Sequence, residues 1–142
     1  MVEVNAAIKG EAIATITFIW MQGEADARLK YGDVYGASLK GLYEQLSDDM
    51  GRTDINFIIG RISDFDLNDQ NYPDWSKVRE AQVKFAESCT RCSWVDTDDL
   101  NDGVNKKGEQ VLNGLHYTVE GYKLLGIRFA EEAIELIHNN KE

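Results

Sequence analysis

His116 is the residue whose type and position most directly indicate catalysis. It stands in residues 113–117 (NGLHY), immediately before an amphipathic segment, and the other histidine of the chain, His138, lies near its end. Because an imidazole titrates near neutral pH, a loop histidine can serve as a general base. The pattern leaves open the alternative of a surface or helix-capping histidine.

A second candidate is the stretch WMQGEAD at residues 20–26. It follows an apolar, β-branched run over residues 12–19 that is typical of a buried strand. Open parallel α/β sheets bind ligands at the carboxyl ends of their strands. Gly23 would let the chain turn there and present Gln22 and Glu24 at the rim. A strand followed by an ordinary polar loop is the alternative.

Three further groups have an ordinary explanation beside a functional one. Arg79, within a helical pattern, would be a surface charge or would bind a carboxylate such as Glu24 in a charge-assisted pair. The acidic residues over 96–102 lack the ligand order of an EF-hand, so we expect a solvated loop and no metal site. Cys89 and Cys92 supply half of a zinc site and close a helix rather than open one, so free, partly buried thiols are expected.

The elements that must position these groups alternate between apolar runs and amphipathic segments. The expected strands cover residues 12–19, 55–59 and 93–96, and the expected helices cover residues 36–50, 75–88 and 119–138. A loop is expected over residues 25–35, Thr118 is an expected N-cap, and Gly51 is expected to end its helix. This order predicts right-handed crossovers and a parallel sheet. A sheet of three strands is small, which indicates missing strands supplied by a truncated segment or a partner.

The composition indicates one acidic globular domain of 142 residues and 16.0 kDa, with 43% hydrophobic residues. A single proline and no low-complexity run disfavour disorder. The net charge of −10 disfavours nucleic acid or an anionic membrane as partner, since both require a basic surface. The chain carries no recognisable signal peptide or membrane-length apolar run, so a soluble protein is expected. Its compartment stays open, and an extracellular or virion-associated location is compatible with the full-length protein.

Three blocks resemble, in order, those of the sialate O-acetylesterase-like (SASA) branch of the SGNH hydrolases. Residues 20–26 resemble its W-x-Q-G-E-[SA]-D block, residues 75–82 its W-x-x-V-R-E-x-Q block, and residues 113–128 its closing D-G-x-H…G-x-R block. The resemblance implies a three-layer α/β/α sandwich with a parallel, flavodoxin-like sheet, incomplete at the N-terminus. Residues 1–142 would then form the C-terminal portion of a single esterase domain.

The resemblance also implies an activity, the removal of acetyl groups from sugars such as sialic acid or xylan. The mechanism would be of the Ser-His type, with an acetylated carbohydrate as partner and no metal or organic cofactor. His116 would be the base. Gln22 and Gly23 would help to form the oxyanion hole, and Glu24 and Arg79 would support that turn.

Two departures from the family pattern bear on activity. The G-Q-S-N-like turn that carries the family's serine is absent, which indicates that the nucleophile lies outside this chain. Asn113 stands where the family has the aspartate that orients the histidine. An amide can accept a hydrogen bond from the imidazole but offers no negative charge to the imidazolium. Deamidation of Asn113, which precedes Gly114, would then be expected to raise activity.

Two alternatives of other classes remain. A non-catalytic carbohydrate-binding or assembly module derived from this fold would stack sugar rings on aromatic residues such as Trp20, Tyr72 and Trp75. A chain that completes its sheet with another chain would form a homo-oligomer or aggregate through an apolar edge.

Overall fold

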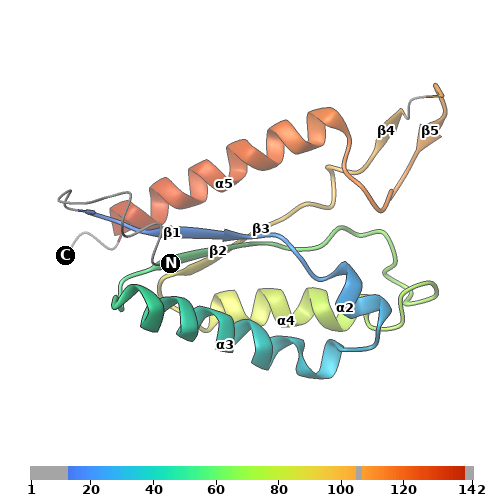
Figure 1. Cartoon of the computed structure of the whole chain (residues 1–142). Coiled ribbons are helices and arrows are strands. Elements are labelled where there is room, and N and C mark those ends of the chain that lie inside the picture. The colour runs from blue at the N-terminus through green and yellow to red at the C-terminus, as the bar shows by residue number, and fades with distance from the viewer. Residues whose placement is uncertain (1–12, 105–106, 140–142) are drawn as a thin grey trace.

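The computed structural model, which describes residues 13–104 and 107–139, has a parallel sheet between two layers of helices (Figure 1). The strands of this sheet are β1 (Thr17–Trp20), β2 (Asn56–Gly60) and β3 (Cys92–Val95). The helices are α2 (Glu24–Arg28), α3 (Gly32–Met50), α4 (Trp75–Glu87) and α5 (Val119–Asn139). The strands follow the order β1-β2-β3, and both neighbouring pairs are parallel. The α/β class and the parallel sheet expected from the sequence are confirmed.

The central strand β2 separates two hydrophobic clusters, because successive side chains of a strand point to opposite faces. Phe57 and Ile59 belong to the cluster on the side of α3 and α4. Ile58 packs with Leu125 and Phe129 of α5 on the other side. All three strand side chains are completely buried, and each contributes roughly 1.5–3 kcal/mol to folding. The uninterrupted apolar run of β2 is thus explained by burial on both faces.

Three local features differ from the expectation. Residues 25–35 are not a loop, because α2 follows Gly23 directly and α3 begins at Gly32, four residues earlier than predicted. The backbone N–H of Gly32 donates to Asp74 at 2.9 Å, which holds this start against α4. The first strand is shorter than predicted, and residue 12 lies outside the described residues. A hairpin of β4 (Gly103–Val104) and β5 (Gln110–Val111), which the pattern did not predict, precedes α5.

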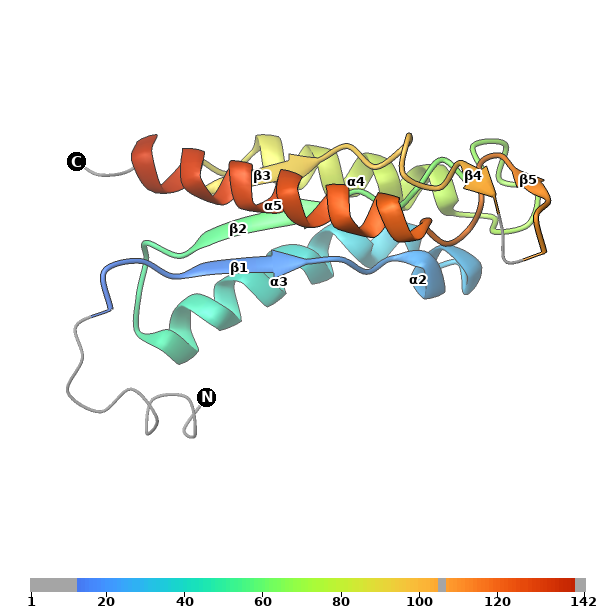
Figure 2. The same cartoon turned by 90° about the horizontal axis from the view of Figure 1, so that it is seen from above.

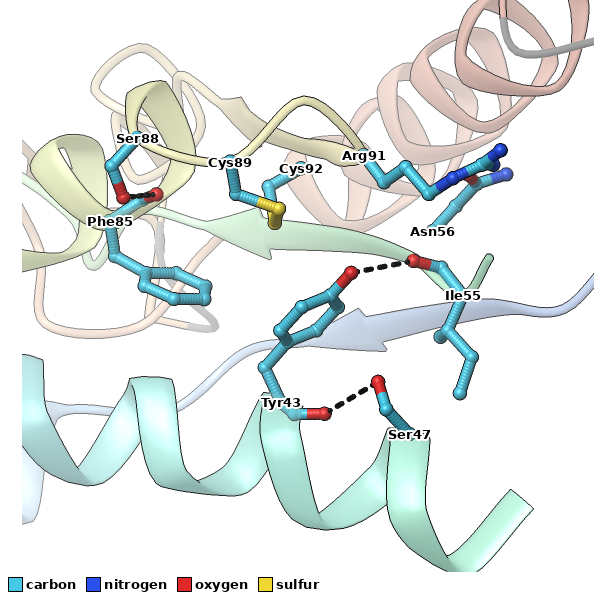
Figure 3. Close-up of a disulfide and its surroundings, with 9 residues drawn as sticks. All are labelled: Tyr43, Ser47, Ile55, Asn56, Phe85, Ser88, Cys89, Arg91 and Cys92. Carbon is cyan, nitrogen blue, oxygen red and sulfur yellow. Dashed lines mark hydrogen bonds between the residues drawn. A yellow bond between two sulfur atoms is a disulfide. The ribbon is translucent and has the colours of Figure 1, made fainter. Parts of the chain in front are cut away.

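Cys89 and Cys92 form a disulfide, so the expectation of free thiols was wrong. The turn between the end of α4 and the start of β3 brings their Cα atoms to 5.1 Å, within the usual range for a disulfide. Figure 3 shows the bond on the side of the turn that faces Tyr43 and Phe85. Cys92 also packs against the cluster beneath the sheet. The bond therefore fastens the end of a helix to the start of a strand.

Both outer strands, β1 and β3, have an unpaired edge within the described residues, and β1 is the one that α5 covers least. β1 pairs only with β2, and α5 packs on β2 and β3, so that β1 lies beside α5 when seen from above (Figure 2). Ile19 shares the α5 face with its neighbour Ile58, yet is 48% exposed. Ile127 and Ile134 of α5 are exposed as well. No helix of the described part is both long and apolar enough to cross a membrane.

Candidate functional site

The segments that carry the predicted site residues meet at the carboxyl end of the sheet. The turn after β1, the loop after β2, and the hairpin that precedes α5 all lie beyond this end (Figure 1). This is the position at which parallel α/β sheets bind ligands.

The turn after β1 depends on Gly23 and on a buried glutamine of α4. Gly23 has φ +152°, and a Cβ added there would lie 2.7 Å from Cγ1 of Val78. Gln82 is fully buried, and its Nε2 donates to the carbonyl oxygen of Gln22 at 2.8 Å. Its Oε1 accepts from the backbone N–H of Ile62 at 3.0 Å. Gln82 therefore ties the turn after β1 to the loop after β2, a role that the sequence analysis missed.

Tyr35 of α3 gives the same carbonyl a second donor. Its hydroxyl donates to the oxygen of Gln22 at 2.7 Å, and burial raises the pKa of Tyr35 above its ordinary value. The side chain of Gln22 donates to Asp26 within the first turn of α2. With its carbonyl held by two donors, the Gln22–Gly23 peptide has a fixed orientation. Such a fixed peptide is the kind of group that can direct an N–H at a developing negative charge.

Arg79 forms its ion pair with Asp98 and not with Glu24, the partner that we predicted. The guanidinium donates to both carboxylate oxygens of Asp98, at 2.8 and 2.9 Å, and to the carbonyl oxygen of Ile62 at 2.5 Å. In a helix each residue is turned by about 100° from the preceding one. Because Val78 faces the turn after β1, Arg79 faces the ends of β2 and β3 instead. It thus braces the second and third strand ends.

The acidic loop is solvated, as expected, since Asp96, Asp99 and Asp102 are exposed, and its carboxylates also form ion pairs with arginines. Asp98 also binds Arg61, and Asp99 forms a two-bond pair with Arg128 at 2.7 Å. This pair lowers the pKa of Asp99 below its ordinary value. Among the described residues, no group of three or more acidic, histidine or cysteine side chains is arranged to hold a metal.

His116 is exposed on the loop between β5 and α5. It lines a pocket of about 380 Å³ together with Asn101 and its neighbour Tyr117. Burial raises the pKa of the Tyr117 hydroxyl well above its ordinary value, and the negative charge of Glu24 adds to this effect. Leu115, the residue before His116, packs against the hydrophobic cluster to which Ala27 of α2 belongs. The histidine loop and α2 thus contact the same cluster.

Asn113 is held by two carboxylates. It has φ +49°, a left-handed conformation that asparagine tolerates well. Its backbone N–H donates to Asp102 at 2.7 Å, and its Nδ2 donates to Oδ2 of Asp64 at 2.8 Å. The other oxygen of Asp64 accepts from Nδ2 of Asn101 at 2.8 Å. The amide of Asn113 is thus oriented toward Asp64, and no hydrogen bond joins it to His116 in the described structure. Asp64 and Asn101 were not identified as site residues from the sequence.

The six serines all lie within the described residues, and none of them makes a hydrogen bond with His116. Ser63 stands at the carboxyl end of β2 but is 2% exposed, and its hydroxyl has no hydrogen-bond partner. A hydroxyl enclosed in this way cannot reach a substrate carbonyl. The geometry of the described chain therefore does not contain a Ser-His pair.

Comparison with known proteins identifies the family. The family model described as carbohydrate esterase, sialic acid-specific acetylesterase (SASA) matches residues 1–135. A protein from Arabidopsis thaliana with a solved X-ray structure has a similar fold, with a TM-score of 0.68 and 24% sequence identity. The match covers 93% of this chain and 49% of the plant protein, so the chain spans about half the length of that relative. No curated protein sequence matches the chain significantly. The chain belongs to the SASA family of carbohydrate esterases.

Proposed function

We propose that this chain is the histidine-bearing part of a carbohydrate O-acetylesterase whose nucleophilic serine lies outside it. The observation that supports this most is the position of His116, exposed at the carboxyl end of a parallel sheet and beside a pocket. The family match over residues 1–135 adds the reaction class. The absence of a Ser-His pair among the described residues supports a serine supplied by another segment.

In the proposed reaction His116 accepts the proton of that serine as the hydroxyl attacks the acetyl carbonyl. The histidine then returns the proton to the sugar oxygen as the ester bond breaks, and water hydrolyses the acetyl-enzyme by the same route. The Gln22–Gly23 peptide would stabilise the oxyanion, held in place by Gln82. Glu24 would be a positioning residue at this turn, and Arg79 would position the ends of β2 and β3 through Asp98 and the Ile62 carbonyl.

The open side of β1 is the place where we expect the serine-bearing segment to pair. An outer strand offers unpaired backbone groups, and the exposed Ile19, which shares the α5 face of the sheet with Ile58, offers apolar surface. A strand followed by a helix would cover both features. Alternatively, a second copy of this chain pairs with the edge of β1, and light scattering would detect the resulting dimer.

A non-catalytic sugar-binding module is the second candidate, and the lack of a Ser-His pair favours it. Of the three aromatic residues that we expected to stack on sugars, Trp75 is not available, whereas Trp20 and Tyr72 are only half-buried. Trp75 is completely buried, packs edge-to-face on Phe65 and Tyr72, and donates its Nε1 to the carbonyl oxygen of Ser63 at 2.7 Å. Trp75 therefore cannot stack on a sugar. Trp20 lines a pocket of about 260 Å³ with Gln22 and Tyr35, so a binding module has this cavity available besides the pocket at His116.

The test uses a serine-directed fluorophosphonate and the release of acetate from acetylated xylo-oligosaccharides. Both are applied to this chain and to a chain extended at its N-terminus by the remaining half of a related family domain. We expect labelling and acetate release from the extended chain only, and their loss in His116→Gln. His138→Gln is the matched control, since His138 is an exposed histidine near the end of α5.

Acetate release that survives His116→Gln would refute the assigned base. An extended chain that folds but neither labels nor releases acetate would favour the binding module. A histidine-dependent adduct on the unextended chain would show that one of its own serines is the nucleophile.

A further inference from the structure

Asp64 is the carboxylate that holds the segment in front of His116. It lies in the loop after β2, and both of its oxygens accept hydrogen bonds from side-chain amides. Oδ1 accepts from Nδ2 of Asn101 and Oδ2 accepts from Nδ2 of Asn113, both at 2.8 Å. Nδ2 of Asn101 also donates to the carbonyl oxygen of Gly114 at 2.8 Å. One half-buried side chain thus holds both residues with which the histidine loop begins.

These hydrogen bonds fix the orientation of two amide groups. A carboxylate and a carbonyl oxygen only accept, so the NH2 groups of Asn101 and Asn113 must face them. Asn101 is 1% exposed and donates to two acceptors, which leaves its amide a single orientation. Asn113 is exposed, and its NH2 group donates to Asp64. The oxygen of the Asn113 amide is therefore directed away from Asp64.

His116 follows Asn113 by three residues in a folded turn. A Cβ added at Gly114 would lie 3.3 Å from the carbonyl oxygen of His116, so the turn folds back closely on itself. Both Asn113 and His116 are exposed, and the imidazole can therefore turn to meet the amide without displacing a packed group. The two are not hydrogen-bonded in the described structure, but catalytic hydrogen bonds often shorten only when a substrate binds.

We infer that Asp64 is the positioning residue of His116 and acts on it through Asn113. By holding the NH2 group of Asn113, Asp64 leaves Oδ1 of that amide to accept from Nδ1–H of the imidazole. Neutral His116 then carries its proton on Nδ1, and its Nε2 is free to act as a base. The inference rests on the proposed function, in which His116 is that base. The carboxylate at position 64 thereby prevents the amide at position 113 from turning its NH2 group to the imidazole.

The most direct test is Asp64→Asn, which keeps the size of the side chain and removes its charge. Because the amide of Asn101 cannot flip, the new amide must turn its oxygen toward Asn101 and its NH2 group toward Asn113. The Asn113 amide then flips to accept from it and presents its own NH2 group to the imidazole. We therefore expect neutral His116 to change from mainly Nδ1–H to mainly Nε2–H.

The tautomer is measured from the imidazole nitrogen shifts of the isotope-labelled chain by NMR at pH 8, where histidines are mostly neutral. This measurement requires neither a serine nor a substrate. His138, exposed near the end of α5, is the internal control and should keep its spectrum in every variant. Asp33→Asn, at an exposed aspartate of α3, is the matched control and should leave the tautomer of His116 unchanged.

Two further variants separate action through Asn113 from a merely structural role. The double variant Asp64→Asn/Asn113→Asp places a carboxylate, which only accepts, at position 113 and should restore the Nδ1–H tautomer. Asn113→Ala removes the amide and should by itself abolish the preference for Nδ1–H, so that adding Asp64→Asn has no further effect. Because Asn113 is exposed, Asn113→Ala also keeps the inference testable if Asp64→Asn does not fold.

The second readout is turnover by the chain extended at its N-terminus. Asp64→Asn should lower kcat for acetate release by at least about tenfold with little change in KM, because a histidine in the wrong tautomer cannot accept the proton of the serine. The double variant Asp64→Asn/Asn113→Asp should recover this loss.

An unchanged tautomer of His116 in Asp64→Asn, or no recovery in the double variant, would overturn the inference. A mainly Nε2–H imidazole in the parent chain would do the same. The expected tautomers without acetate release from the extended chain would count against the proposed function alone. Acetate release that is lost in His116→Gln but unaffected by Asp64→Asn would count against this inference alone.

Discussion

Replacing Asn113 by aspartate separates two explanations of this position. The family pattern predicts that Asn113→Asp supplies a carboxylate to the histidine and raises activity, as deamidation would. The structure instead predicts that the variant is less stable, because Nδ2 of Asn113 lies 2.8 Å from Oδ2 of Asp64. A carboxylate in the same place would face another carboxylate. The hydrogen bond from the backbone N–H of Asn113 to Asp102 would be kept.

The expected loss of folding stability follows from the contact between Asn113 and Asp64. A hydrogen bond to a charged group contributes about 1.5–3 kcal/mol, and the variant loses it. Two like charges 2.8 Å apart repel by about 1.5 kcal/mol even at the dielectric constant of water. Because Asn113 is exposed, the new side chain can turn toward the solvent and relieve much of this repulsion. We therefore expect a loss of about 1–3 kcal/mol, or a melting temperature lower by about 3–10 °C.

The assay is thermal unfolding of the parent and the variant at pH 8 and at pH 3.5. The difference should shrink at the lower pH, where a protonated carboxyl can donate to its neighbour. The double variant Asp64→Asn/Asn113→Asp should recover most of the loss. Asparagine at position 64 can donate to the new carboxylate and still accept from Asn101. A variant as stable as the parent at pH 8, or no recovery in the double variant, would refute this reasoning.

Three further predictions concern the elements that hold the site. Gly23→Ala should lower the free energy of unfolding by about 2–4 kcal/mol in urea titrations, because the new Cβ would lie 2.7 Å from Val78 at φ +152°; unchanged stability would contradict the tight turn. Cys89→Ser should cost about 2 kcal/mol, the chain-entropy value for so short a loop, and a reductant should lower the melting temperature of the parent to that of the variant. If the reductant has no effect on the parent, Cys89 and Cys92 are not joined. Asp66 accepts backbone N–H groups of the following turn. Burial opposes its ionisation, but these bonds prevail and lower its pKa. The pKa is thus lower in the folded than in the unfolded state, so this stabilisation is complete above about pH 4 and is lost as the pH falls through the folded value. Asp66→Asn should therefore be less stable than the parent at pH 7 and approach it below about pH 4; a pH-independent difference would contradict the assignment.

The local pattern of this sequence was sufficient for its class of fold. Alternating apolar runs and amphipathic segments predicted a parallel sheet with helices. The spacing of apolar residues along the chain indicates which side chains a helix or a strand buries. Two helix ends were also predictable from single residues. Thr118 accepts from the backbone N–H of Gly121 at 3.0 Å, and Gly51 adopts φ +61° after α3. These features depend on residues that are near in the chain.

Tertiary structure alone decided which of the candidate groups meet. The partner of Arg79 is Asp98 and not Glu24, because the direction of a helical side chain depends on how α4 is rotated against the sheet. The pairing of Asn113 with Asp64 joins residues 49 positions apart in the chain, and no local spacing encodes it. The sequence thus determined the three main strands and helices and indicated a catalytic candidate, but not α2 or the β4–β5 hairpin. The contacts that orient the site arise only when the strand ends are brought together, because they depend on distances between segments that are remote in sequence.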